Sequence, residues 1–278
     1  MAFLPYRRMD RSALDLAYNN VRAEPDYLAM MARFKEQGDA LYRNVDARRD
    51  IAYGPRPRQR FDWLTGDRAD APTFLFVHGG YWQNYTKEDL AFVAKGALEC
   101  GFNVVLAEYT LAPDASMTEI VGEIGLMIEF LQNSGSDIGF GGRPVCLCGH
   151  SAGGQLAALY RSHPAITLTM TISALFDLEP IAQCWLNDKL QLTPQEIARF
   201  SPLRKIEPGA PLIVSVGADE LPELIRQSED YADACKAGGE TASFLSLPGR
   251  RHFSILTDLA DPNGVQLATV ASALAKSL

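Results

Sequence analysis

The stretch of this chain that decides its fold is PVCLCGHSAGG, residues 144–154. A short apolar run enters a G-x-S-x-G sequence, and the small-residue segment QLAAL at 155–159 leaves it with helical character. This is the strand–turn–helix context of a nucleophile elbow, a sharp turn that exposes a serine hydroxyl at the carboxyl end of a sheet. Glycines are needed around the serine because side chains there would collide with the neighbouring strand and helix. The pattern predicts Ser151 as a nucleophile; the alternative is an ordinary glycine-rich connection.

A second glycine-rich motif is HGGYW at 78–82, which follows TFLFV at 73–77, a stretch that reads as a fully buried strand. A loop of the H-G-G type after a buried strand supplies backbone N–H groups to an oxyanion hole, and its glycines let the backbone approach the substrate. The alternative is a plain turn in which Tyr81 and Trp82 are core aromatics. Two such motifs in this order indicate an enzyme that transfers an acyl group to its serine.

A serine nucleophile needs a general base, and the chain has four histidines. The ring of His78 is expected to brace the H-G-G loop, His150 points off the opposite side of the elbow, and His163 is expected at a solvated helix end. His252 follows the apolar run at 244–247 and precedes a final helix. The order serine, acid, histidine places the base at this point of the chain. We therefore predict that His252 is the base.

The acid that orients the base is expected after a late buried strand. The apolar run at 212–216 is followed by Asp219 and Glu220. Asp219 is the first acid beyond the strand, and we predict that it holds His252 in the required tautomer. Glu220 is the alternative, because one residue of loop slippage exchanges the two. Asp177, which ends another predicted strand, is expected to be structural or to line the pocket.

The remaining sequence fits a single α/β domain over residues 1–278. Apolar runs alternate with helical patterns, which is typical of a mostly parallel central sheet covered by helices on both faces. Strands are predicted at 73–77, 103–107, 144–148, 168–173, 212–216 and 242–247, with weaker antiparallel candidates at 49–53 and 60–64. Helices are predicted at 87–100, 117–133, 151–162, 222–238 and 258–277. We therefore expect a sheet of about eight strands.

Two segments lie outside this alternation. Residues 1–48 have helical spacing and form a predicted N-terminal helical extension, with Leu28, Met31 and Phe34 on the apolar face of one helix. Residues 177–207 interrupt the alternation between two strands. They are predicted to form a small cap over the nucleophile, and the alternative is a surface helix pair without a role in substrate binding.

The composition disfavours several other classes of protein. The formal net charge of −8 argues against nucleic-acid binding, which requires basic patches. No apolar run approaches the length of a membrane span, and residues 1–10 lack the apolar core of a signal peptide. The five cysteines are an odd number and fit free thiols in a reducing cytoplasm. Since the chain has no zinc-type histidine spacing and no phosphate-binding loop, no metal or cofactor is predicted.

The motifs resemble those of the kynurenine formamidase (arylformamidase) branch of the α/β-hydrolases, which is related to the hormone-sensitive-lipase-like esterases. Those esterases typically carry a further glycine where Tyr81-Trp82 stands here. The resemblance spans roughly residues 73–256 and rests on HGGYWQ at 78–83, GHSAG at 149–153, SALFDLEP at 173–180, SPL at 201–203 and HF at 252–253. It implies the α/β-hydrolase fold.

The resemblance also implies the residues of the site. By the family pattern, the catalytic triad would be Ser151, Asp219 and His252. The oxyanion hole would consist of the N–H groups of Gly80, Tyr81 and Ala152. The residues predicted to line the substrate pocket are His78, Gly79, Trp82, Asp177, Trp185 and Arg251. Arg250 and Arg251 adjoin the base and are candidates for binding a substrate carboxylate, with solvent-exposed arginines as the alternative.

The reaction implied by the resemblance is hydrolysis of N-formyl-kynurenine to kynurenine and formate. The bulk of Tyr81 and Trp82 favours a small acyl group, formyl or acetyl, on the amide or ester that is cleaved. The alternatives are a short-chain carboxylesterase or amidase acting on another catabolic intermediate, and a binding protein that has kept only the fold. We also expect that the chain forms a homodimer, which is a common arrangement of such enzymes.

Overall fold

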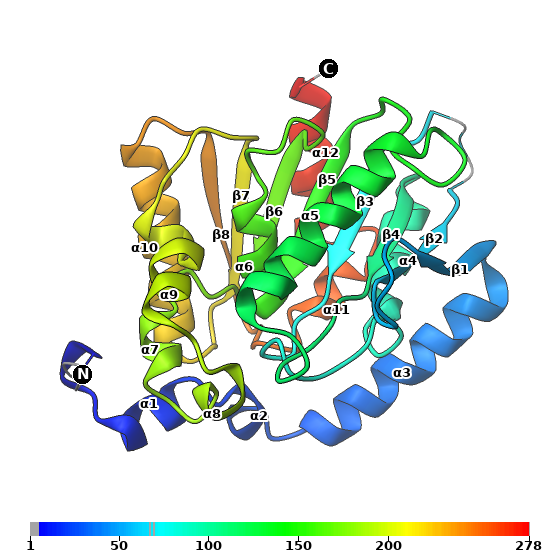
Figure 1. Cartoon of the computed structure of the whole chain (residues 1–278). Coiled ribbons are helices and arrows are strands. Elements are labelled where there is room, and N and C mark those ends of the chain that lie inside the picture. The colour runs from blue at the N-terminus through cyan, green and yellow to red at the C-terminus, as the bar shows by residue number, and fades with distance from the viewer. Residues whose placement is uncertain (1–5, 67, 69, 278) are drawn as a thin grey trace.

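An eight-stranded sheet forms the centre of the computed structural model, which describes residues 6–66, 68 and 70–277 (Figure 1). The strands lie in the spatial order β1-β2-β4-β3-β5-β6-β7-β8. Their bounds are β1 (Ala47–Ala52), β2 (Arg60–Leu64), β3 (Thr73–Val77), β4 (Asn103–Ala107), β5 (Val145–His150), β6 (Leu168–Ile172), β7 (Leu212–Gly217) and β8 (Ala242–Leu247). The pairs β1–β2 and β2–β4 are antiparallel, and the other five pairs are parallel. The predicted strands and the mostly parallel α/β-hydrolase sheet are confirmed.

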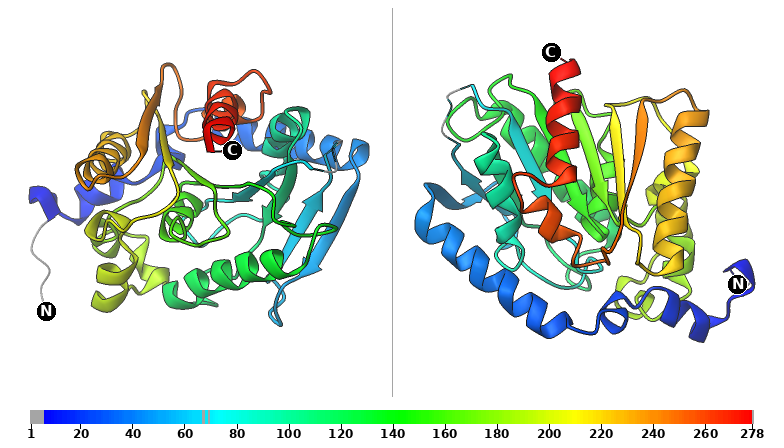
Figure 2. Two further views of the ribbon diagram at one scale, coloured as in Figure 1. Left: turned by 90° about the horizontal axis from the view of Figure 1, so that it is seen from above. Right: turned by 180° about the vertical axis from the view of Figure 1, so that it is seen from behind.

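Helices cover both faces of this sheet, as the view from above in Figure 2 shows. Residues of one strand alternate between two core clusters. Leu75 packs on the face covered by α5 (Met117–Asn133) and α6 (Ala152–Leu159), whereas Phe74 and Phe76 pack on the face covered by α3 (Tyr27–Asn44), α4 (Ala94–Glu99) and α12 (Val265–Ser277). This double burial explains why β3 reads as a continuous apolar run. The flanking helices are α4 (Ala94–Glu99), α5 (Met117–Asn133), α6 (Ala152–Leu159), α10 (Pro222–Ala237), α11 (Leu256–Leu259) and α12 (Val265–Ser277), and the 3₁₀ turn η2 (Ala91–Val93) precedes α4.

Helices occupy most of residues 6–44 in the predicted N-terminal extension, whose residues 1–5 lie outside the described chain and whose end at Ala47 begins β1. The apolar face of its longest helix differs from the prediction. The elements of the extension are η1 (Tyr6–Arg8), α1 (Arg11–Ala17), α2 (Asn20–Ala23) and α3 (Tyr27–Asn44). The buried face of α3 consists of Met30, Phe34 and Gly38, spaced four residues apart, with Met31 at its edge. Leu28 is 81% exposed, because the face set by the stacking of Phe34 on Phe92 lies on another side of the helix.

Residues 177–207 contain short helices between β6 and β7. These are α7 (Glu179–Ala182), α8 (Asn187–Leu190), α9 (Pro194–Phe200) and η3 (Pro202–Arg204). The start of α9 has a capping box between Thr193 and Glu196. The Glu196 carboxylate also accepts hydrogen bonds from the N–H and hydroxyl of Thr118, which joins α9 to α5. In Figure 1 these helices lie at the same end of the sheet as α1 and α2.

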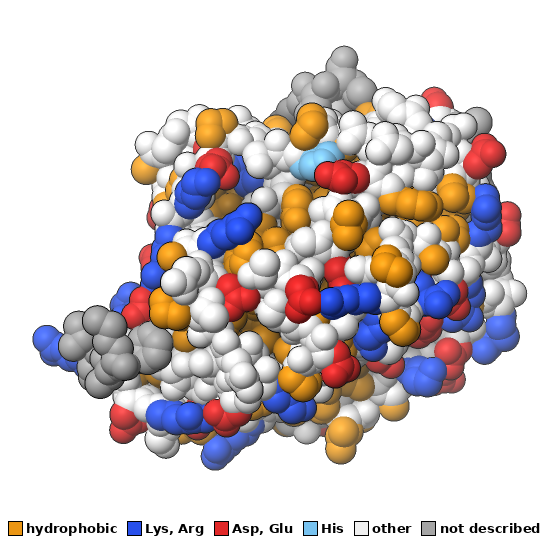
Figure 3. Space-filling model, in the orientation of Figure 1, with side chains coloured by type: hydrophobic (Ala, Val, Ile, Leu, Met, Phe, Trp, Pro, Cys, Tyr) orange, Lys and Arg blue, Asp and Glu red, His pale blue; other side chains and the backbone are white. Residues whose placement is uncertain are grey.

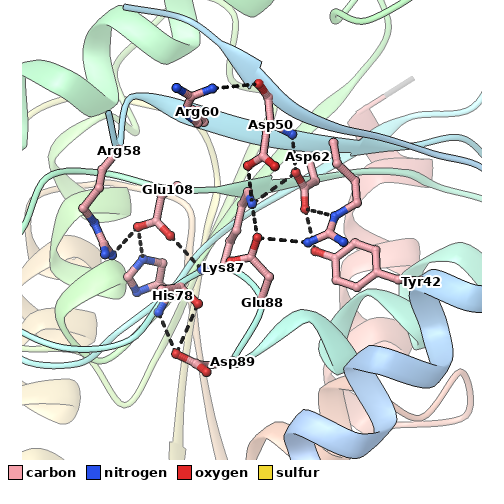
Figure 4. A network of polar contacts seen from close by, with 12 residues as sticks. Tyr42, Asp50, Arg58, Arg60, Asp62, His78, Lys87, Glu88, Asp89 and Glu108 are labelled. Atoms are coloured by element: carbon pink, nitrogen blue, oxygen red, sulfur yellow. Dashed lines mark hydrogen bonds and ion pairs between the residues drawn. The ribbon is translucent and has the colours of Figure 1, made fainter. Parts of the chain in front are cut away.

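A buried charge network connects α3 and the first two strands to the segment that follows the HGGYW loop (Figure 4). Asp62 has no exposed side-chain surface, and it accepts a hydrogen bond from the Tyr42 hydroxyl at 2.6 Å. The Lys87 ammonium, which is also buried, lies 3.2 Å from Asp62 and 3.0 Å from Asp50. These contacts hold the edge of the sheet against the loop region.

The outer surface is mixed in charge. Figure 3 shows Lys and Arg interspersed with Asp and Glu over one face, with hydrophobic side chains between them. None of the helices in the part of the chain that the structure describes is both long and apolar enough to cross a membrane.

Replacing Asp62 with alanine tests the buried network. The change removes one of three acids beside the Lys87 ammonium and leaves the Tyr42 hydroxyl without its acceptor, so we expect the free energy of unfolding to fall by about 2–3 kcal/mol. Urea denaturation measures it. The matched control is Asp39→Ala, which removes an exposed ion pair with Lys35 and should change stability by less than about 0.5 kcal/mol. Equal effects of the two substitutions would contradict the prediction.

Candidate active site

Ser151 lies in a strained turn between β5 and α6. Its backbone angles are φ 54° and ψ −119°, which a non-glycine residue adopts only when the surroundings impose them. A Cβ on Gly149 would lie 2.0 Å from the Gly153 carbonyl oxygen, and one on Gly153 would lie 2.1 Å from the Val77 oxygen. The glycines of the G-x-S-x-G motif are therefore required by this close packing, as the sequence predicts. The side chain of Ser151 is held at the carboxyl end of β5.

The HGGYW loop approaches the same serine. A Cβ built on Gly79 would lie 2.9 Å from the Cβ of Ser151. The next residues, Gly80, Tyr81 and Trp82, all have positive φ angles, 102°, 57° and 58°. Among the described residues, no acceptor is hydrogen-bonded to the N–H groups of Gly80, Tyr81 or Ala152. These are the three donors expected for an oxyanion hole, and all three belong to the two segments that meet at Ser151.

The two aromatic residues of the loop have different surroundings. Trp82 has no exposed surface, and its indole N–H donates to Gln155 Oε1 in α6 at 3.1 Å. The prediction that Trp82 lines the substrate pocket is therefore wrong, because this hydrogen bond directs the ring into the core behind the elbow. Tyr81 is directed toward the N-terminal segment: its hydroxyl donates to the Tyr18 carbonyl at 3.0 Å and accepts from the Asn20 N–H at 2.9 Å.

His78 braces the loop from within. Its Nδ1 lies 2.8 Å from the Gly79 carbonyl oxygen, and its Nε2 lies 3.2 Å from Glu108 Oε1. The ring also stacks on Tyr109 at a centroid distance of 4.5 Å. Glu108 accepts further hydrogen bonds from the N–H groups of Lys87 and Tyr109. Since the His78 ring is buried, it supports the loop and does not line a pocket.

The carboxylate beside His252 is that of Glu220 and not that of Asp219. His252 Nδ1 lies 2.9 Å from Glu220 Oε2, and the other oxygen of Glu220 accepts from the Gly217 N–H at 2.8 Å and from the Ser173 hydroxyl. Asp219 is exposed. After β7 the chain makes a turn in which the Glu220 N–H bonds back to the Gly217 carbonyl. This turn places Asp219 on its outer side and directs Glu220 toward the base.

His150 has a role that the sequence did not reveal. Its Nε2 lies 2.8 Å from the backbone carbonyl of His252, and the two rings are 4.7 Å apart, so the ring does not point away from the site as expected. Burial, with a further contribution from His252, holds the pKa of His150 well below its usual range. A neutral ring with Nε2–H can donate to the carbonyl and hold the loop that carries the base.

The other predicted pocket residues lie at the margin of this site or outside it. Asp177 accepts hydrogen bonds from the Glu179 N–H and from Arg204, which indicates a structural role. Trp185 lies against Tyr81 with ring centroids 5.6 Å apart. It also borders a cavity of about 430 Å³, whose other lining residues are Ser12, Asp15, Leu16, Asn19 and Arg22. Arg251 is exposed next to the base.

Comparison with known proteins agrees with this geometry. The BD-FAE family model matches residues 64–166. The kynurenine formamidase of Danio rerio is 28% identical over 98% of this chain and 99% of its own length. The kynurenine formamidase of Salmo salar is 30% identical, with 76% of each chain covered. The chain belongs to the kynurenine formamidase family. A crystal structure from Silicibacter sp. TM1040, of a protein provisionally assigned as a thioesterase, matches with a TM-score of 0.82 and 26% identity over 93% of this chain and 98% of that one.

As a member of the kynurenine formamidase family, the chain is a serine hydrolase of the α/β-hydrolase type. The structure brings Ser151, His252 and the Gly80–Tyr81 backbone to one end of the sheet and adds Glu220 in place of Asp219. The acid that lies beside His252 can be identified only from the turn after β7. Such a turn is not visible in residue types alone.

Substituting each acid separately distinguishes them. Glu220→Ala removes the carboxylate that holds His252 Nδ1, so kcat/KM for p-nitrophenyl acetate should fall by about 10³–10⁴-fold. Asp219→Ala is the matched control, one residue away and exposed, and should remain within about threefold of the unchanged enzyme. A larger loss for Asp219→Ala than for Glu220→Ala would restore the original assignment.

Proposed function

We propose that this protein hydrolyses N-formyl-kynurenine to kynurenine and formate, with Ser151 as the nucleophile, His252 as the base and Glu220 as the orienting acid. The observation that carries the proposal is the Glu220–His252 pair at the same end of the sheet as a strained Ser151 and three N–H donors that have no acceptor among the described residues. Two relatives that are 28% and 30% identical are named as kynurenine formamidases, which supports the choice of substrate.

The proposed reaction begins with transfer of the Ser151 proton to His252 as the hydroxyl attacks the formyl carbon. The oxyanion that forms accepts hydrogen bonds from the N–H groups of Gly80, Tyr81 and Ala152, each worth about 3–4 kcal/mol in comparable sites. Glu220 stabilises the imidazolium. The bond between the formyl carbon and the aniline nitrogen then breaks, and His252 gives its proton to that nitrogen. Water repeats the cycle on the formyl-enzyme and releases formate.

The immediate surroundings of Ser151 favour a small acyl group. Only 2% of the serine surface is exposed. Gly79 packs against its Cβ, and the Tyr81 side chain is held in place by two hydrogen bonds to the N-terminal segment. Because Trp82 lies in the core, Tyr81 is the one ring of the loop that remains a candidate for limiting the size of the acyl group.

We also propose that the N-terminal extension and residues 177–207 together form the cap. The contacts of Tyr81 with Tyr18 and Trp185 support this, as does the hydrogen bond from the Gln83 amide to the Leu186 carbonyl at 2.8 Å. Both segments thus touch the loop that carries two of the oxyanion donors. The cytoplasmic location and the homodimer remain predictions.

A short-chain carboxylesterase or thioesterase is the second candidate. It is favoured by the structural match to a protein that is assigned to the thioesterases and is 26% identical. The same three side chains would perform this reaction, since only the leaving group differs.

Measuring kcat/KM for N-formyl-kynurenine and p-nitrophenyl acetate with the purified protein tests the function. We expect the formamide to be preferred by at least about tenfold, a difference of about 1.4 kcal/mol in transition-state binding. Ser151→Ala serves as the blank and should abolish both activities. Hydrolysis of the acetate alone would overturn the formamidase proposal and leave the esterase candidate.

Acyl chain length tests the shape of the acyl site. Among p-nitrophenyl esters, the acetate should have a kcat/KM at least about tenfold higher than the octanoate, because the longer chain has no room beside Gly79 and Tyr81. The leaving group is the same in both esters, which removes differences in chemical reactivity. Faster turnover of the octanoate would show that the acyl site is open.

A further inference from the structure

Glu24 is a buried residue with one carboxylate oxygen that the described residues leave unsatisfied. It lies between α2 and α3, only 8% of its surface is exposed, and its Oε2 is buried without a hydrogen-bond partner. The backbone around it is ordered, since its N–H donates to the Val21 carbonyl and its carbonyl accepts from the Tyr27 N–H. A buried carboxylate without a partner is costly, which indicates that a ligand supplies the donor.

The segment that carries Glu24 spans the two halves of the active site. Four residues earlier, the Asn20 N–H donates to the Tyr81 hydroxyl in the oxyanion loop. Three residues later, the ring of Tyr27 packs on Phe253, the neighbour of the base, with centroids 5.1 Å apart. Glu24 lies between these two anchors, over the end of the sheet where substrate must enter.

The charges that act on Glu24 come from His252, from Arg251 and Glu220 beside it, and from Asp26 on the same segment as Glu24. Burial raises the pKa of its carboxyl. The positive charges of Arg251 and of protonated His252 lower it, and the negative charges of Asp26 and Glu220 raise it. Glu24 is therefore within electrostatic reach of both members of the Glu220–His252 pair, although Oε2 is hydrogen-bonded to neither.

We propose that Glu24 is a specificity-determining residue that binds a protonated amino group on the leaving-group portion of the substrate. The base marks the leaving-group side, because His252 must deliver its proton to the departing atom. The Asn20 amide oxygen is likewise buried without a partner, so the segment offers two acceptor oxygens. An ammonium carries three N–H donors and matches two acceptors, one of them charged, better than a neutral hydroxyl does.

This inference rests on the proposed active site but not on formamide as the substrate, so esters can test it separately. The probes are the acetate esters of 3- and 4-(2-aminoethyl)phenol, with 3- and 4-propylphenyl acetate as uncharged counterparts of nearly equal shape. For each pair we measure the ratio of kcat/KM, charged over uncharged, in the unchanged enzyme, in Glu24→Gln and in Asp26→Asn. Asp26 is the matched control, since it is an exposed acid two residues away.

In at least one isomer pair, the unchanged enzyme should prefer the charged ester, and Glu24→Gln should lower the ratio by about tenfold or more, the worth of a hydrogen bond to a charged group. Asp26→Asn should change the ratio by at most about threefold, because the Asp26 charge is exposed and acts on the site only through solvent. The proposal is overturned if Glu24→Gln leaves the ratio unchanged in both isomer pairs. Equal losses on the charged and uncharged esters of both pairs would show a role in folding alone. If the esters behave as expected but N-formyl-kynurenine is not hydrolysed, the proposed function fails and the role of Glu24 stands.

Discussion

The close approach of three backbone segments around Ser151 is the constraint on which the site depends. The end of β3, the elbow after β5 and the start of α6 meet so closely that Cβ atoms at Gly149 and Gly153 would lie about 2 Å from carbonyl oxygens, far inside any real contact. This contact places the nucleophile and three N–H donors within one small region. It also explains why the strain at Ser151 persists. The parallel pairing of β3 with β5 holds the strand that enters the turn, and the close packing of Gly153 on Val77 holds the helix that leaves it.

Buried polar contacts then hold the oxyanion loop in place from behind. Glu108 joins the His78 ring and the Lys87 N–H, and the side chain of Lys87 reaches the acids at the edge of the sheet. Arg58 reaches the same carboxylate and the Tyr85 carbonyl. Since each of these groups is satisfied by another, a change at the sheet edge can alter the loop without touching the nucleophile. The stability of the fold and the geometry of the loop therefore depend on the same network of buried polar contacts.

The sequence predicted those parts of the site that depend on local backbone sterics. The glycines beside Ser151 and in the H-G-G motif have one physical explanation, so their spacing is informative without any structure. The acid was harder, since Asp219 and Glu220 differ only in which side of a turn they occupy. Leu28 and Trp82 were placed wrongly because apolar character says that a residue can be buried but not where. No sequence pattern pointed to Glu24, because the feature that singles it out is a buried oxygen without a hydrogen-bond partner among the described residues.

Tyr81 connects the proposed oxyanion loop with the N-terminal segment. Its backbone belongs to the oxyanion loop, while its hydroxyl holds the N-terminal segment that carries Glu24. A leaving group that engages this segment therefore acts on the same residue whose N–H would stabilise the oxyanion. Binding energy from a remote part of the substrate can in this way be used to align the groups that act in the transition state. Because that linkage passes through one buried side chain, the proposed recognition of the leaving group and the proposed stabilisation of the oxyanion would be coupled through Tyr81.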